Sequence, residues 1–297
     1  MRIYNVDGRA TLSVGDGIVD IEDASAGAFS SDPQTVFDRW DEVGRWAAEF
    51  RGAPVAPLPT GVHIQSPVPR PRQIFAIGIN YALHVEESGL EMPSTPTVFA
   101  KFPASITGPY ESIALPDGAV DFEAELVVVI GAHADRVASD DAWRYVAGLT
   151  VGQDLSERYT QWSGSPPQQM SLGKSFAGFS PLGPAVVSPD EFPDPDDVAL
   201  GCSVNGTVMQ QARTSDMIFS VPVLIEYISG IVPLLPGDVI FTGTPSGVGF
   251  TRTPQVLLTP GDELTTYVEG IGEMRHTFTK RSDGPSTQVK DQATCSG

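Results

Sequence analysis

The chain contains, at positions 120–131, the run Val120-Asp121-Phe122-Glu123-Ala124-Glu125-Leu126-Val127-Val128-Val129-Ile130-Gly131. After Glu125 this run is apolar and β-branched, which is typical of a strand buried in a sheet. Side chains alternate across a strand, so Glu123 and Glu125 are expected to point to the same face. The run therefore predicts a buried strand that carries a pair of carboxylates at its start.

Two neighbouring carboxylates at the mouth of an apolar strand repel each other and lose their hydration. They stay ionised only if a cation lies between them. Oxygen ligands of this kind suit Mg²⁺ first, and Mn²⁺ or Ca²⁺ next. The alternative is that Glu123 and Glu125 lie at an exposed strand end, where most glutamates are found.

The composition limits the class of protein. With 18 basic and 37 acidic residues among 297, the net charge is −19, which argues against binding to nucleic acid or anionic membranes. Cys202 and Cys295 lie in unrelated contexts, and four histidines show no zinc spacing, so neither a disulfide nor a zinc site is expected. The first residues lack the apolar segment of a signal peptide, and no apolar run approaches the ~20 residues of a spanning helix. We expect a soluble cytoplasmic protein.

Residues 1–66 are predicted to form a small N-terminal domain that ends in a proline-rich connector. Strand-like runs at 2–5 and 17–21 precede a helix that is expected to begin near Asp32, with Pro33 in its first turn. Its apolar positions are Val36, Phe37, Trp40, Val43 and Trp46.

Residues 67–281 are predicted to form the main domain, with a flexible tail at 282–297. Short strand-like segments occur at 73–78, 198–205, 239–244, 256–258 and 264–268. Helices are expected at 140–147 and 214–229. Because strands far outnumber helices and do not alternate with them, the chain is predicted to be mainly β (α+β), with a curled mixed sheet.

Asp154 and Lys174 are further candidates for the same site. Asp154 ends an apolar strand-like run at 145–153, where an aspartate is either a cap or a third metal ligand. Lys174 follows Gly173, but the first glycine that a phosphate-binding loop needs upstream is missing, which excludes such a loop. Lys174 is expected to pair with the carboxylates or to hold a substrate oxyanion; the alternative is an exposed turn.

His84 and Glu87 are three positions apart and share a face if this segment is a short helix. A carboxylate beside an imidazole raises its basicity and fixes its tautomer, as a general base requires. The pair is then catalytic and on a mobile lid, or else a solvated surface pair. Downstream, a glycine-rich turn at 242–249 offers amides and hydroxyls for a carboxylate, or is simply a tight loop.

These motifs follow one another in a fixed order along most of the chain. They are Gly78-Ile79-Asn80-Tyr81 with His84 and Glu87, Phe122-Glu123-Ala124-Glu125-Leu126, Asp154 with Arg158 and Gln161, Gly173-Lys174-Ser175-Phe176, Asn205-Gly206 with Gln210, Thr214 and Met217, and Gly237-Asp238 with the turn at 242–249. As an ordered set, over about residues 74–268, they resemble the fumarylacetoacetate hydrolase superfamily.

The resemblance implies a mixed β-roll catalytic domain, a small N-terminal α/β domain and a homodimer. It implies Mg²⁺ or Mn²⁺ as cofactor. The implied roles are catalysis by His84, Glu87 and Lys174, substrate binding by Arg158, Gln161 and Thr244, and metal ligation by Glu123, Glu125 and Asp154. Glu157 and Tyr159 depart from the family's motif, which leaves the substrate preference open.

The resemblance also implies a metal-dependent enzyme of aromatic compound catabolism, acting on 2-oxo or 2-hydroxy-dienoic (di)carboxylic acids through an enolate. Two reactions fit: C–C hydrolysis of an acylpyruvate, or isomerisation of the 2-hydroxyhepta-2,4-diene-1,7-dioate type. Oxaloacetate decarboxylation at the same site is the alternative. A non-catalytic metal-binding protein is the alternative from another class, and the presence of His84 and Glu87 beside three carboxylates argues against it.

Overall fold

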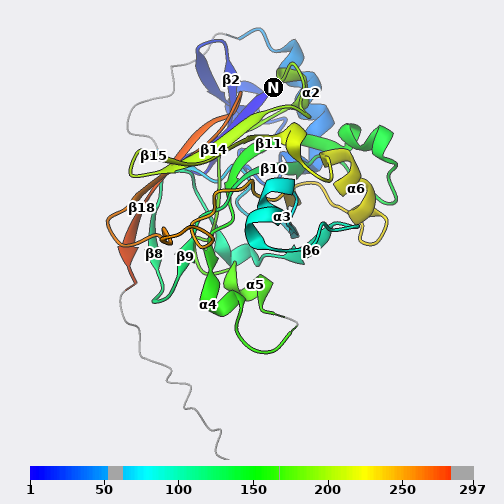
Figure 1. Cartoon of the computed structure of the whole chain (residues 1–297). Coiled ribbons are helices and arrows are strands. Elements are labelled where there is room, and N and C mark those ends of the chain that lie inside the picture. The colour runs from blue at the N-terminus through cyan, green and yellow to red at the C-terminus, as the bar shows by residue number, and fades with distance from the viewer. Residues whose placement is uncertain (53–62, 167, 282–297) are drawn as a thin grey trace, which may run out of the picture.

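Strand β10 (Ala124–Ile130) lies inside a sheet of eleven strands in the computed structural model, which describes residues 1–52, 63–166 and 168–281 (Figure 1). It pairs antiparallel with β11 (Val146–Gln153) on one side and β16 (Val239–Phe241) on the other. All seven of its residues are buried, and from Leu126 to Ile130 they alternate between two separate cores. This burial on both faces explains the unbroken apolar run in the sequence.

The large sheet mixes parallel and antiparallel pairs, with β4 (Ile64–Gln65) added to β1 and β7 (Ile106–Thr107) added to β13. Its strands in order are β3 (Gly17–Asp20), β2 (Arg9–Val14), β1 (Arg2–Val6), β13 (Ser180–Val187), β11, β10, β16, β5 (Ile74–Gly78) and β6 (Thr97–Ala100).

A second sheet of five strands covers one side of the first. Its strands β14, β15 and β18 are labelled in Figure 1. Its strands in order are β15 (Thr207–Arg213), β14 (Ala199–Val204), β17 (Glu263–Val268), β18 (Gly272–Lys280) and β8 (Ser112–Leu115). A short pair, β9 (Val120–Asp121) and β12 (Ser156–Glu157), leads into the site. The prediction of a mainly β, mixed-sheet fold is confirmed.

Helices are few and lie around the sheets. The α-helices are α1 (Ile21–Ala24), α2 (Trp40–Glu49), α3 (Ala82–Ser88), α4 (Arg158–Gln161), α5 (Met170–Gly173) and α6 (Val221–Ser229). The 3₁₀ helices are Phe37–Arg39, Pro103–Ser105, Ser139–Tyr145, Pro189–Glu191 and Thr214–Asp216.

Three predicted helices differ from the structure. The helix expected near Asp32 begins only at Trp40, because the Asp32 side chain and carbonyl accept the Gln34 and Thr35 amides in a turn. The segment predicted as a helix at 140–147 is a 3₁₀ helix that ends at Tyr145. Val146 instead pairs with Ile130 in the sheet, so sheet hydrogen bonds replace helical ones.

The helix predicted at 214–229 is divided into Thr214–Asp216 and α6. Pro222 lies in the first turn of α6, since a proline has no N–H to donate and clashes inside a helix.

Two predicted strands also differ, and several strands were missed. The strand at 239–244 ends at Phe241, since Gly243 adopts a φ of 97° and turns the chain. Positions 256–258 form no strand: Val256 and Leu258 bond to Gly249 and Val120, which belong to different segments. Strand β2 between the two predicted N-terminal strands was not foreseen, and neither were β6, β8, β13, β15 and β18.

The N-terminal strands extend the main sheet, because β1 pairs antiparallel with β13. The division into domains at residue 66 stays a prediction. The predicted tail at 282–297 and most of the proline-rich connector lie outside the described residues.

His276 is a buried titratable group of the second sheet. Its Nε2 lies 2.9 Å from the Gly108 carbonyl oxygen, and within the described residues its Nδ1 has no hydrogen-bond partner. Burial lowers the pKa of His276 to about 4, although Gly108 and Glu111 act in the opposite direction.

We therefore expect His276 to make folding sensitive to acid. The unfolded chain takes up a proton near pH 6.5 and the folded chain only near 4, so the stabilisation is complete above 6.5 and is lost toward pH 4. The loss amounts to about 3 kcal/mol. His276→Gln keeps an N–H donor and does not titrate, so its free energy of unfolding should fall less between about pH 7.5 and 4. Urea unfolding of both proteins measures this, and equal losses would contradict it.

Candidate functional site

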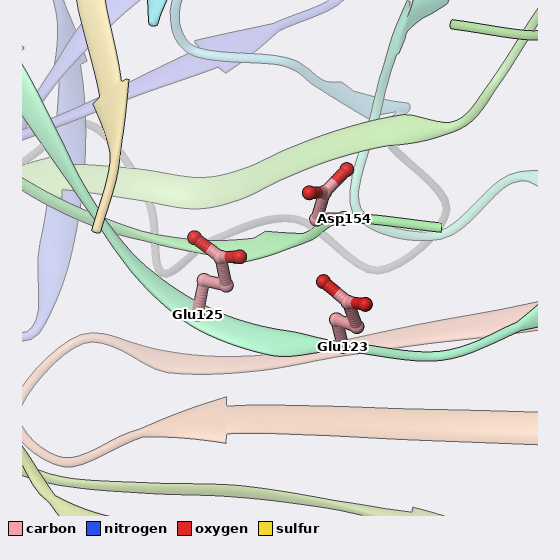
Figure 2. A group of neighbouring side chains, drawn as sticks. All are labelled: Glu123, Glu125 and Asp154. Carbon is pink, nitrogen blue, oxygen red and sulfur yellow. The ribbon is translucent and has the colours of Figure 1, made fainter. Parts of the chain in front are cut away.

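Three buried carboxylates meet where β10 and β11 lie side by side. Glu123 and Glu125 share one side of the β10 segment, and Asp154 follows the end of β11 (Figure 2). One oxygen from each of the three lies within 4.8 Å of the others. The structure thus brings together the three residues that the sequence grouped, and it excludes an exposed strand end.

Two buried lysines contact this triad. Lys174 Nζ donates to Glu123 and Asp154, each at 2.7 Å, and to the Ser156 hydroxyl at 2.9 Å. Lys101 Nζ donates to the other oxygen of Asp154 and, at 3.1 Å, to the Phe179 carbonyl. Lys174 is therefore not in an exposed turn, and all three of its N–H bonds are used within the protein.

Arg158 completes the positive side of the cluster. Its Nη2 lies 2.7 Å from Glu123 and 2.6 Å from Asp121, and its Nη1 donates to Gln161 at 2.9 Å. Asp121 is fully buried and also accepts the Gly249 amide at 2.7 Å. A carboxylate that accepts this many bonds holds the guanidinium in one orientation.

The ionisation of the triad is uneven. Burial opposes the charge on Glu123, but Lys174 and Arg158 outweigh it and lower its pKa to about 2. Burial, with repulsion from Asp154 and Glu123, raises the pKa of Glu125 well above its ordinary value. Within the described residues Glu125 has no ion pair, and its Oε2 accepts the Gly243 amide at 2.7 Å.

This donor set fits a hard divalent cation. Three carboxylates lie close enough to share one ion, and the member without a cationic partner is the one whose charge a metal would offset. Mg²⁺ and Mn²⁺ both accept oxygen ligands of this kind.

Local structure explains why α4 and α5 meet here. Glu157 accepts the Tyr159 and Thr160 amides at 3.1 and 2.7 Å, so it caps α4 and orients the arginine that follows it. A Cβ on Gly173 would lie 2.7 Å from the Gln161 backbone, so only glycine allows this approach. Glu157, which departs from the family motif, thus caps α4. Tyr159, the other position that departs from the motif, is 67% exposed.

His84 and Glu87 form the predicted pair on α3. Nδ1 of His84 lies 2.6 Å from Oε1 of Glu87, and Oε2 of Glu87 accepts the Gly247 amide at 2.9 Å. Burial works against the charge on Glu87, but its bonds to His84 and Gly247 outweigh it and hold its pKa below the ordinary value. The histidine is buried, so this is not a solvated surface pair. Movement of α3 as a lid stays a prediction.

A cavity of about 630 Å³ joins these groups. The predicted residues that line it are His84, Glu87, Glu123, Arg158, Gln161, Lys174 and Thr244. The Thr244 hydroxyl is engaged with the Ala124 carbonyl at 3.0 Å and with Gln210 at 2.8 Å. His84, Glu123 of the triad and the candidate substrate-binding side chains therefore all face the same cavity.

Two charged residues of this cluster were missed from the sequence. Asp121 lies in the 120–131 run, two positions before Glu123. This alternate spacing could have indicated that Asp121 faces the same side as Glu123. Lys101 lies between Ala100 and Phe102, and a lysine in an apolar segment before a proline was the only sign of its burial.

Comparison with known proteins agrees with this site. The family model "Fumarylacetoacetate (FAA) hydrolase C-terminal" matches residues 73–279. The chain belongs to the fumarylacetoacetate hydrolase family. The match spans the triad, the pair on α3 and the 242–249 turn, so the family resemblance drawn from the motifs is confirmed.

Individual members of this family differ in their described activities. The rat mitochondrial oxaloacetate tautomerase Fahd2a is 38% identical over 87% of this chain and 83% of its own. A Mycobacterium smegmatis structure described as a candidate HpcE protein is 52% identical, with a TM-score of 0.90 over 95% of this chain and all of its own. Maleylpyruvate hydrolase from Sphingobium sp. SYK-6 is 28% identical, with a TM-score of 0.77 over 95% of this chain and all of its own.

The comparisons establish a fumarylacetoacetate hydrolase family enzyme and leave its reaction open. Within the part of the chain that is described, no helix has the length and apolar character needed to cross a membrane.

Removal of one triad charge tests the metal site. Glu125→Gln keeps an oxygen for the Gly243 amide but removes a charge that Glu123 and Asp154 repel. We expect the melting temperature in EDTA to stay equal or rise, and the stabilisation by Mn²⁺ to disappear. Calorimetric titration with Mn²⁺ should show binding in the wild type only. Unchanged Mn²⁺ affinity in the variant would exclude this site.

Proposed function

We propose that this chain is a divalent-metal-dependent enzyme that moves a proton at carbon 3 of a 2-oxo acid, as a tautomerase or isomerase does. One observation supports it above the others: a buried histidine paired with a carboxylate lines the same cavity as Glu123 and Lys174. The cavity thus combines a group that can carry a proton with a site that can hold an oxygen-rich acid.

The metal would be held by Glu123, Glu125 and Asp154, and when bound it supplies a Lewis acid that stabilises charge on the oxygens of the substrate. Lys174 and Lys101 hold Asp154 from its two oxygens, and Lys174 also fixes Glu123. These contacts keep the carboxylates in place without rearrangement during the reaction.

His84 is the proton carrier in this proposal. Glu87 is ionised and accepts only, so it holds the proton of His84 on Nδ1 and leaves Nε2 as the basic nitrogen. Nε2 takes the proton from carbon 3, the electrons of that C–H bond form the C2–C3 double bond, and the carbonyl oxygen gains the charge. The proton held on Nε2 then passes to that oxygen and completes the enol, which leaves His84 neutral again, and the reverse sequence restores the keto form.

Oxaloacetate is the first substrate to test, because a relative that is 38% identical is named an oxaloacetate tautomerase. The predicted cytoplasmic location, homodimer and part in aromatic catabolism remain predictions beside this proposal.

Variants of the pair test the role of His84. His84→Ala should lower kcat for oxaloacetate tautomerisation by roughly 10²–10⁴-fold, the usual effect of losing a positioned base, and leave Mn²⁺ binding intact. Glu87→Gln should act in the same direction with a smaller loss, since it changes only the tautomer and basicity of the imidazole. The decay of the enol absorbance under saturating Mg²⁺ measures the rate.

The matched control is His133→Ala, an exposed histidine outside the cavity, which should keep the full rate. A His84→Ala variant that retains wild-type kcat would remove the base from this mechanism.

Hydrolysis of an acylpyruvate is the second candidate. The cavity of about 630 Å³ favours it, because such a space has room for an acyl group and a water molecule beside the histidine. Hydrolysis needs a base to activate water, whereas oxaloacetate decarboxylation needs only charge stabilisation and a later proton. His84→Ala should therefore cut acetylpyruvate hydrolysis by roughly 10²–10⁴-fold and oxaloacetate decarboxylation far less. Identification of the products from both substrates decides between these reactions, and equal losses would reject this division of roles.

A further inference from the structure

The cavity lining outside the charged cluster is largely apolar. Its apolar members include Leu90, Pro93, Phe99, Trp162, Met170 and Phe250. A volume of about 630 Å³ lies in the range of pockets that enclose ligands larger than a four-carbon acid. The lining thus offers contact area to a substrate that extends beyond its 2-oxo carboxylate end.

The cations of this lining are already engaged. Arg158 uses Nε and Nη2 on Asp121, Nη2 also on Glu123, and Nη1 on Gln161. Lys174 uses its three N–H bonds on Glu123, Asp154 and Ser156. Among the described lining residues, no other lysine or arginine remains to pair with a second substrate carboxylate.

The remaining charged groups of the lining disfavour a second carboxylate. Glu91 lines the cavity, and within the described part of the chain it makes no ion pair. Glu87 is hydrogen-bonded to His84, so the imidazole already pairs with a carboxylate of the protein itself. A substrate carboxylate placed here would lose hydration and face repulsion without gaining a counter-ion.

Resting on the function proposed above, we propose that the cavity selects 2-oxo acids with a single carboxylate and an uncharged, apolar substituent on carbon 3, in preference to dicarboxylic acids. The 2-oxo carboxylate end lies at the triad, and the apolar substituent contacts the side chains around Phe99 and Trp162.

Phenylpyruvate and oxaloacetate form a matched pair for the test. Both have the same 2-oxo carboxylate end, and carbon 3 carries a phenyl ring in one and a carboxylate in the other. We expect kcat/KM for tautomerisation of phenylpyruvate to exceed that of oxaloacetate by about tenfold or more, because a site that leaves a charge unpaired discriminates strongly against it. Enol absorbance follows both reactions under the same Mg²⁺ concentration.

An added cation should reverse this preference. Ser88 lines the cavity four residues after His84, on the same face of α3, and its replacement with arginine also suits a helix C-terminus. Ser88→Arg should raise kcat/KM for oxaloacetate relative to phenylpyruvate by about tenfold. Glu91→Gln, which removes a repelling charge, should shift the ratio in the same direction by a smaller factor.

Leu83→Arg is the matched control, since Leu83 lies on the same helix, is 65% exposed and does not line the cavity. It adds the same charge and should leave the ratio unchanged. A wild-type preference for oxaloacetate, or a ratio that neither Ser88→Arg nor Glu91→Gln changes, would overturn the substrate inference and leave the proposed function standing. Failure to tautomerise either acid would overturn the proposed function and this inference with it.

Discussion

Buried carboxylates must be balanced by buried cations at the junction of β10 and β11, and the surrounding elements are arranged around this requirement. Four buried carboxylates, Asp121, Glu123, Glu125 and Asp154, lie among three buried cationic side chains, Lys101, Arg158 and Lys174. Buried charges of this kind are costly unless each is paired and hydrogen-bonded. The fourth carboxylate, Glu125, has no cationic partner within the described residues, and its raised pKa shows that its charge needs one, as expected of a site that takes up a cation before an anionic substrate.

Much of the surrounding fold serves to hold this cluster. β10 is buried on both faces, which gives the triad a rigid base between two cores. The capping bonds of Glu157 and the close approach at Gly173 bring α4 and α5 to the same place. Residues far apart in the chain are thus fixed to within hydrogen-bonding distance, as preorganised electrostatic stabilisation requires.

The pair on α3 adds a second kind of chemistry to the same cavity. Asn80, just before α3, donates to the Thr242 carbonyl at 2.7 Å, and Glu87 accepts from Gly247, so both the helix and its carboxylate are joined to the 242–249 turn. That turn also bonds to Glu125 through Gly243. The turn therefore links the proton-carrying pair to the triad, and its glycines serve this close approach as well as a tight bend.

Local patterns in the sequence predict the buried strand, the three carboxylates, the pair of His84 and Glu87, and the mainly β class. Each rests on a local signal: strand alternation places Glu123 and Glu125 on one face, and helical spacing places His84 beside Glu87. Tertiary contacts, by contrast, account for the burial of Lys101 and Asp121. These depend on partners distant in the chain. Lys101 meets Asp154, and Asp121 meets Arg158, only after the sheets pack, and no local pattern records such a contact.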